Sequence, residues 1–202
     1  MRVLVTGFGR FPGAPVNPTS TLAREMARRR RLISRGIHVE SRILPTEWAI
    51  LDAFDAHLAA SRPDIVLMLG LAARRRHVSI ELWAANAASR SPDAARRHAP
   101  GRALVTGGPG RRPCAALPAA LLHALRLARL PAGLSRDAGR YLCNALAYRA
   151  YASVGARGRP ARAVFVHIPP PVRAGIGLPA LLRGLEDIVM ALAAQLRAAP
   201  SR

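Results

Sequence analysis

The sequence predicts an α/β layered domain with a largely parallel sheet. Apolar runs of strand length alternate along the chain with longer stretches of helical periodicity, which is typical of parallel α/β folds. The run at 64–70 is apolar almost throughout, as expected of a strand covered by helices on both faces. With 202 residues the chain can bury a large core without disulfide or metal support, so we expect one domain over 1–202.

The first half of the chain predicts three strands and two helices. A strand at 3–5 runs into a glycine-rich loop, and a helix follows over 18–36, because Asn17 is a good cap and Pro18 suits the first helical position. Alternation over 37–44 predicts the second strand, and apolar spacing over 48–60 predicts the second helix. The apolar run at 64–70 is the third strand.

The second half predicts two strands, three helices and a long connection. We expect strands over 77–84 and 163–168, and helices over 117–130, 141–151 and 179–196. Residues 86–113, rich in Arg, Ala, Gly and Pro, predict an irregular loop. No internal repeat and no second domain is indicated.

The positive charge of the chain suggests nucleic-acid binding, but other features of the sequence argue against a specific nucleic-acid site. The formal net charge is +20, and all 31 basic residues are arginine. Aromatic residues make up only 4% of the chain, which leaves few surfaces on which bases could stack. The arginine-rich stretches, such as 28–31 and 74–76, are also scattered. We therefore expect a solvated basic surface and no specific nucleic-acid site, and keep a basic nucleic-acid-associated protein as the alternative.

Targeting and redox signals predict a cytoplasmic protein. No apolar run approaches the roughly 20 residues that span a bilayer, so no membrane partner is expected. The chain enters its first strand without a signal-peptide pattern. Cys114 and Cys143 are the only cysteines, and without a CxxC pair they suggest neither a disulfide framework nor a zinc site.

The loop after the first strand resembles a dinucleotide-binding loop only superficially. Gly7, Gly9 and Gly13 are too widely spaced for GxGxxG, and the helix begins too late to meet a pyrophosphate. The loop instead carries Phe8 and Phe11, at the strand edge where open α/β sheets bind ligands. These rings could line a slot for a flat, weakly polar ring, or they could cover the end of the sheet; the residues alone leave both open.

Three residues could together perform nucleophilic catalysis. Cys143 follows a turn of small residues at a helix start, where free backbone N–H groups favour a thiolate. His167 ends an apolar strand, and Glu81 lies inside another, where a buried carboxylate needs a partner. They supply a nucleophile, a base and an orienting group. The alternatives are a buried structural thiol, which suits Cys114 better, and a hydrogen-bonded core histidine.

Several segments together resemble one known family. RVLVTGFGRF with VNPTS, then VSIE, LSRDAGRYLCN and FVHIP, in this order, are similar to the pyroglutamyl peptidase I (pyrrolidone-carboxylate peptidase) family of cysteine peptidases. The resemblance implies an α/β/α sandwich, no metal or cofactor, a homotetramer, and removal of an N-terminal pyroglutamyl residue from peptides through a thioester. It places the catalytic triad on Cys143, His167 and Glu81, and the aromatic pair around the substrate ring on Phe8 and Phe11.

The chain departs from the family pattern in two loops. The family sequence GFxPFGG is GFGRFPG here, with Arg10 and Pro12 at the altered positions. The family stretch GQAGGR before the glutamate is GLAARR, so Leu71 stands at the glutamine position that we assign to substrate binding. These changes favour, as an alternative, a related triad amidase acting on a different amide or lactam. The complete triad argues against a catalytically silent scaffold.

Overall fold

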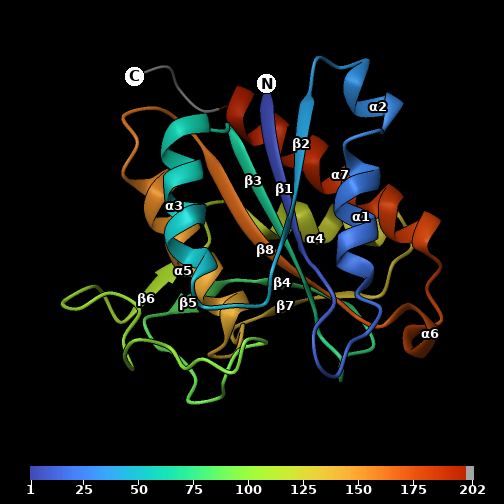
Figure 1. Cartoon of the computed structure of the whole chain (residues 1–202). Helices are drawn as coiled ribbons and strands as arrows, with labels where there is room; N and C mark the ends of the chain where they lie inside the picture. Colours follow the sequence, from blue (N-terminus) through green and yellow to red (C-terminus); the bar gives the residue numbers. More distant parts are fainter. Residues whose placement is uncertain (199–202) are drawn as a thin grey trace.

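The structure, a computed structural model, describes residues 1–198 and is built on a six-stranded sheet in the order β2-β1-β3-β8-β4-β7 (Figure 1). Its strands are β1 (Arg2–Phe8), β2 (His38–Leu44), β3 (Ile65–Leu71), β4 (Val78–Glu81), β7 (Ala132–Ser135) and β8 (Arg162–Ile168). All neighbouring strands are parallel except β4 and β8, which are antiparallel. The predicted largely parallel sheet is confirmed.

Helices cover both faces of this sheet (Figure 1). One face packs against α1 (Pro18–Met26), α2 (Arg30–Ile33), α4 (Pro118–Leu127) and α7 (Leu178–Arg197), and the other against α3 (Ile50–Ser61) and α5 (Leu142–Gly155). Strand side chains alternate between the two cores, so that Val3 and Val5 enter the first and Leu4 enters the second. The α/β/α sandwich implied by the resemblance is confirmed.

The opening loop is a close strand-to-helix connection. A Cβ atom at Gly7 would lie 2.2 Å from the carbonyl oxygen of Thr19, so only glycine lets β1 approach α1 this closely. Asn17 caps α1 as predicted, because its Oδ1 accepts a hydrogen bond from the Thr19 amide at 3.1 Å. The loop therefore runs from a glycine that allows packing to a cap that starts the helix.

The predicted helix 18–36 is wrong as a single element. The helix α1 ends at Met26, and a separate turn of helix, α2, begins at Arg30. Between them Arg29 takes an extended conformation and its guanidinium binds the buried carboxylate of Glu186 on α7 at 2.6 Å. The break also lets Leu32 turn into the core, where it is fully buried. Tertiary contacts, not local propensity, decide this boundary.

The predicted strand 77–84 is also wrong as a single element. The chain bends after Glu81, and β5 (Trp83–Ala85) leaves the main sheet to pair with β6 (Arg111–Pro113), inside the segment expected to be loop. The short elements β7 and α6 (Pro171–Ala174) were not predicted at all. Four- and three-residue elements carry too little periodicity to be recognised from sequence.

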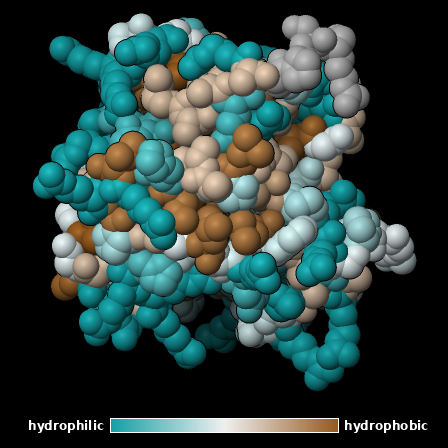
Figure 2. Space-filling view, turned by 180° about the vertical axis from the view of Figure 1, so that it is seen from behind, coloured by the Kyte–Doolittle hydropathy of each residue, from teal (hydrophilic) through white to brown (hydrophobic). Residues whose placement is uncertain are grey.

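Seen from behind, the molecule presents an apolar area in the middle of a largely hydrophilic surface (Figure 2). This is the side of α4 and α7, where Leu117 and Leu127 are among the exposed large apolar residues. Among residues 1–198 there is no helix of the length and apolarity needed to cross a membrane.

Candidate active site

The pairing of β4 with β8 brings Glu81 and His167 together. The two strands run antiparallel with Ser79 opposite His167, and both side chains of the pair are buried. His167 Nδ1 and Glu81 Oε1 are 2.7 Å apart, which is a short, charge-assisted hydrogen bond when the imidazole is protonated. The predicted orienting carboxylate therefore contacts the predicted base directly.

Both groups have shifted protonation equilibria. Burial by itself lowers the pKa of His167, but hydrogen bonds with Cys143 and Glu81 outweigh it and raise the pKa to about 9. Burial raises the pKa of Glu81, yet its hydrogen bond with His167 and further polar contacts hold that pKa below the usual value. The pair therefore favours an imidazolium beside a carboxylate at neutral pH.

Cys143 is held over this pair by the start of α5. It is the second residue of the helix, is partly exposed, and lies close enough to His167 to raise the pKa of the imidazole. The capping residue Tyr141 gives no side-chain hydrogen bond, so the first backbone N–H groups of α5 keep no capping partner. A Cβ atom at Gly70 on β3 would lie 2.9 Å from Cys143 Sγ, which shows how closely the thiol packs on the sheet.

Two buried polar side chains fix this arrangement and were missed by the sequence analysis. The amide of Asn144 exchanges hydrogen bonds with the backbone of Ala85, at 2.7 and 2.9 Å, and so ties the start of α5 to β5. The hydroxyl of Tyr151 receives a hydrogen bond from the Phe165 amide at 3.1 Å. An asparagine directly after the candidate nucleophile, in the first turn of a helix, was the signal available in the sequence.

Arg75 was also missed as a site residue, because it stands within an arginine run. Arg74 and Arg76 point to solvent, whereas Arg75 is only partly exposed and its Nη1 lies 2.6 Å from Glu81 Oε1. The stretch 74–76 is therefore not one exposed basic cluster. An arginine six residues before a buried glutamate was the signal that could have suggested the pair.

The structure separates the three predicted substrate-binding residues by exposure. Phe8, the last residue of β1, is buried in the core with Leu44 and Trp48. Phe11 is partly exposed in a tight turn that pairs it with Ala14. Leu71, at the end of β3, is also partly exposed. Phe11 and Leu71 are thus more accessible than Phe8.

The remaining candidate residues lie apart from this site. Cys114 is buried and free, and burial raises the pKa of its thiol. Its Sγ donates a hydrogen bond to the carbonyl of Ala116, at 3.7 Å, and packs in the second core, as expected of a structural thiol. Within residues 1–198 no three His, Cys, Asp or Glu side chains gather as a set that could hold a metal ion.

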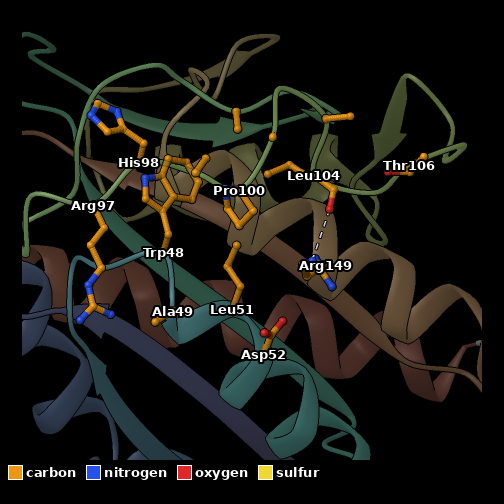
Figure 3. A pocket seen from close by; sticks show the side chains of 14 residues that line it. Trp48, Ala49, Leu51, Asp52, Arg97, His98, Pro100, Leu104, Thr106 and Arg149 are labelled. Carbon is orange, nitrogen blue, oxygen red and sulfur yellow. Dashed lines mark hydrogen bonds between the residues drawn. The ribbon is translucent and has the colours of Figure 1, made fainter.

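A cavity of about 450 Å³ lies on the α3 and α5 side, under the irregular segment that follows β5 (Figure 3). Trp48, Leu51 and Leu104 form much of its wall, and Arg149 bridges the Asp55 carboxylate and the Leu104 carbonyl. None of the three triad candidates lines it. The indole of Trp48 packs edge-on against Tyr141, with ring centres 5.3 Å apart, so this aromatic pair joins the cavity wall to the start of α5.

Comparison with known proteins gives one consistent result. A family model described as pyroglutamyl peptidase matches residues 1–201. The pyrrolidone-carboxylate peptidase of Gloeobacter violaceus is 36% identical over 95% of this chain and 97% of its own length. Pyrrolidone-carboxylate peptidase 1 of Ralstonia nicotianae is 35% identical over 83% of this chain and 77% of its own length.

Solved structures give the same result for the fold. A mutant pyrrolidone carboxyl peptidase from Pyrococcus furiosus superposes with a TM-score of 0.88 at 27% identity, covering 97% of this chain and 100% of that one. The pyrrolidone carboxyl peptidase of Thermococcus litoralis gives a TM-score of 0.86 at 26% identity, covering 97% of this chain and 94% of that one.

Proposed function

The chain belongs to the pyroglutamyl peptidase family, and we propose that Cys143, His167 and Glu81 are the triad with which it removes an N-terminal pyroglutamyl residue from peptides. One observation carries the assignment of the triad. A buried imidazole lies 2.7 Å from a buried carboxylate, and a partly exposed thiol at the start of a helix is close enough to raise the pKa of that imidazole. A nucleophile, a base and a group that orients the base are the parts required for acyl transfer.

The first half of the reaction makes a thioester. The proton of the Cys143 thiol is held by His167, and the thiolate attacks the carbonyl carbon between pyroglutamate and the next residue. The carbonyl oxygen becomes an oxyanion, which uncapped backbone N–H groups at the start of α5 stabilise. The C–N bond then breaks, and the His167 imidazolium gives its proton to the leaving amine.

The second half restores the enzyme. Water attacks the thioester carbon while His167 accepts one of its protons, and the C–S bond breaks to release pyroglutamate. The proton on His167 is again shared with the Cys143 thiolate. Throughout, Glu81 keeps the imidazole oriented by accepting the hydrogen bond from Nδ1, so that Nε2 faces the reacting atoms. No metal or cofactor takes part in this scheme.

We assign recognition of the lactam ring to Phe8, Phe11 and Leu71. Phe11 and Leu71 are partly exposed, and Phe8 ends β1 with its ring in the core beneath the loop. Burying both faces of a small ring against such side chains supplies most of the binding free energy. Leu71 offers no polar group, so the lactam N–H and carbonyl bind backbone groups of the same loops.

The apolar side chain of Leu71 also supports an alternative substrate class. A triad peptidase that lacks a polar side chain at this position could prefer a different amide or lactam over pyroglutamate. The two functions differ in the ring pocket and share the triad, so substrate comparison separates them.

The same features support a proposal about the cellular compartment and the partners of the protein. Both cysteines are free, and a reducing cytoplasm keeps a thiol nucleophile active. The exposed apolar residues Leu117 and Leu127, at the two ends of α4, and the apolar area seen in Figure 2 support contact with further copies of the chain, as in a homotetramer. We expect 1–202 to act as one peptidase domain and its arginines to attract polyanions without sequence preference.

Release of a chromophore from a pyroglutamyl amide, before and after treatment with iodoacetamide, tests the proposal. We expect release by the pure reduced enzyme, and its loss on alkylation of Cys143. The matching prolyl amide serves as the control substrate, because its ring lacks the lactam carbonyl. Preference for the prolyl amide would favour the alternative function, and release that survives complete alkylation of Cys143 would remove it as the nucleophile.

A further inference from the structure

Arg75 makes contacts that a surface arginine would not make. Its Nη1 donates to Glu81 Oε1 at 2.6 Å, the same oxygen that faces His167 Nδ1. Its Nη2 donates to Ser135 Oγ at 3.2 Å and to the carbonyl of Asp137 at 2.9 Å. One guanidinium therefore joins the catalytic carboxylate to the segment that leads from β7 to the nucleophile.

We propose that Arg75 is a positioning residue of the catalytic site, which holds Glu81 in the geometry and the charge state that His167 requires. The inference rests on the triad proposed above. Arg75 does not reach the reacting atoms in this arrangement; it acts through Glu81 and through the segment that precedes Cys143.

The contact between Arg75 and Glu81 matters because the Glu81 carboxylate is buried. Its side chain is fully buried, and its second oxygen, Oε2, has no hydrogen-bond partner among residues 1–198. A buried carboxylate without compensating donors loses its charge or its position. Since the two charged donors that bind it, His167 and Arg75, share the single oxygen Oε1, removal of Arg75 leaves the imidazole as the only cation bound to the carboxylate among residues 1–198.

Charge alternates through the site when the thiolate is formed. The order is Cys143 thiolate, His167 imidazolium, Glu81 carboxylate and Arg75 guanidinium, which sums to zero. A further titratable group close to Glu81 is the phenol of Tyr151, whose hydroxyl donates to the Glu81 backbone carbonyl at 3.4 Å and stays neutral, since burial holds its pKa well above the usual value. Loss of the Arg75 charge disfavours both anions and favours the imidazolium. Both limbs of a pH profile should then move to higher pH.

The test compares Arg75→Met with Arg76→Met on a pyroglutamyl amide. Both changes remove one charge from the same loop, but Arg76 is exposed and makes no contact with Glu81. We expect Arg75→Met to lower kcat by roughly 10- to 100-fold with KM within about twofold, as for loss of a charged hydrogen bond that substrate does not touch. The profile of kcat against pH should move up by roughly half to one unit. Arg76→Met should match the parent in all three quantities.

Two further measurements keep the inference testable whatever the substrate. Alkylation of Cys143 by iodoacetamide, followed against pH in a Cys114→Ser background, reports the thiolate without any substrate; its acid limb should also move up in Arg75→Met. Arg75→Lys keeps the charge and should retain the parent profile while losing part of kcat, because an ammonium cannot span the three acceptors.

The possible results distinguish a wrong substrate assignment from a wrong role for Arg75. An inactive parent enzyme whose alkylation profile still shifts on Arg75→Met would reject pyroglutamyl amides as substrates and keep the role of Arg75. An unshifted profile in Arg75→Met, with normal folding by circular dichroism, would overturn the inference. So would equal loss of activity in Arg75→Lys and Arg75→Met with neither profile moved, since that result describes a purely structural contact.

Discussion

The catalytic side chains and the opening loop are held in very different ways. Glu81 and His167 lie on adjacent strands, are buried, and are 2.7 Å apart. The loop from 9 to 16 is held by few contacts, which include the hydrogen bond from the Gly9 amide to Leu44 and the turn formed by Phe11 and Ala14. Val16, near its end, is 82% exposed.

This difference separates chemistry from recognition. In the proposed triad Glu81 and His167 are fixed by strand pairing and tolerate little change, whereas Phe11 stands on a loop, and Phe8 and Leu71 stand where strands end. Of the departures from the family pattern, Arg10, Pro12, Ala73 and Arg74 lie in connecting segments, and Leu71 is the last residue of β3. Substitutions in the two regions should therefore affect activity and stability in different ways.

Removal of the nucleophile should have the largest effect. Cys143→Ala should lower kcat by at least roughly 10³-fold, because no other group forms the thioester. The fold should persist, since the thiol is partly exposed and makes no core contact that alanine cannot replace. Kinetics with the pyroglutamyl amide and thermal unfolding check both parts. Cys114→Ser is the matched control and should keep its activity.

Gly70→Ala should damage the catalytic region through packing alone. The added Cβ would lie 2.7 Å from the Phe165 ring and 2.9 Å from Cys143 Sγ, and the ring is fully buried. We expect a loss of roughly 10²-fold in kcat, with destabilisation of about 1 to 3 kcal/mol, because the thiol is the freer of the two groups to move. Gly155→Ala is the control, as nothing lies within 4 Å of its Cβ. Full activity in Gly70→Ala would show that Sγ does not depend on this contact.

Glu81→Gln should lower kcat by about 10- to 100-fold, less than loss of the nucleophile, because the amide still positions the imidazole without its charge. It should also change the pH dependence of stability. The pKa of His167 is raised from 6.5 to about 9, so its contribution is fully present below pH 6.5 and is lost as pH rises through about 9.

Unfolding by urea at a series of pH values measures that contribution. In the parent enzyme the free energy of unfolding should fall by roughly 2 to 3 kcal/mol from this source between pH 6.5 and 9.5. In Glu81→Gln the fall should be smaller. An equally steep fall in both proteins would contradict the ion pair.

The two aromatic residues of the recognition region should differ from each other. Phe11→Ala should lower kcat/KM by roughly 5- to 100-fold with little loss of stability, because this ring is partly exposed. Phe8→Ala should weaken substrate capture and also destabilise the fold by about 3 to 5 kcal/mol, since Phe8 is 4% exposed within the core. Paired kinetics and thermal unfolding distinguish them. Unchanged kcat/KM in Phe11→Ala would remove that ring from the pocket.

Leu71→Gln should have the smallest effect and the opposite sign. A side-chain amide at the end of β3 supplies a donor and an acceptor for the lactam, so we expect kcat/KM on the pyroglutamyl amide to rise a few-fold, about one net hydrogen bond. The prolyl amide should gain less. A gain on the prolyl amide alone would favour the alternative substrate class.

The alternation of strands and helices, and the three residues of the proposed triad as candidates, could be read from the sequence; contacts that depend on several elements could not. Cys143, His167 and Glu81 could be picked out because each is a reactive group in an unusual local setting. The break between α1 and α2 could not, because it depends on Arg29 reaching Glu186, which lies far along the chain. The inward turn of Arg75 depends in the same way on β4 and β7 being neighbours.

The pyroglutamyl thioester on Cys143 is the species that tests the account most directly. Enzyme mixed with excess pyroglutamyl amide and quenched in acid should carry an adduct with the mass of one pyroglutamyl group. Peptide mapping should place it on the fragment that contains Cys143, and Cys143→Ala should carry none. Substrate turnover with no adduct in Glu81→Gln or the parent, or an adduct on Cys114, would contradict the proposed catalytic centre.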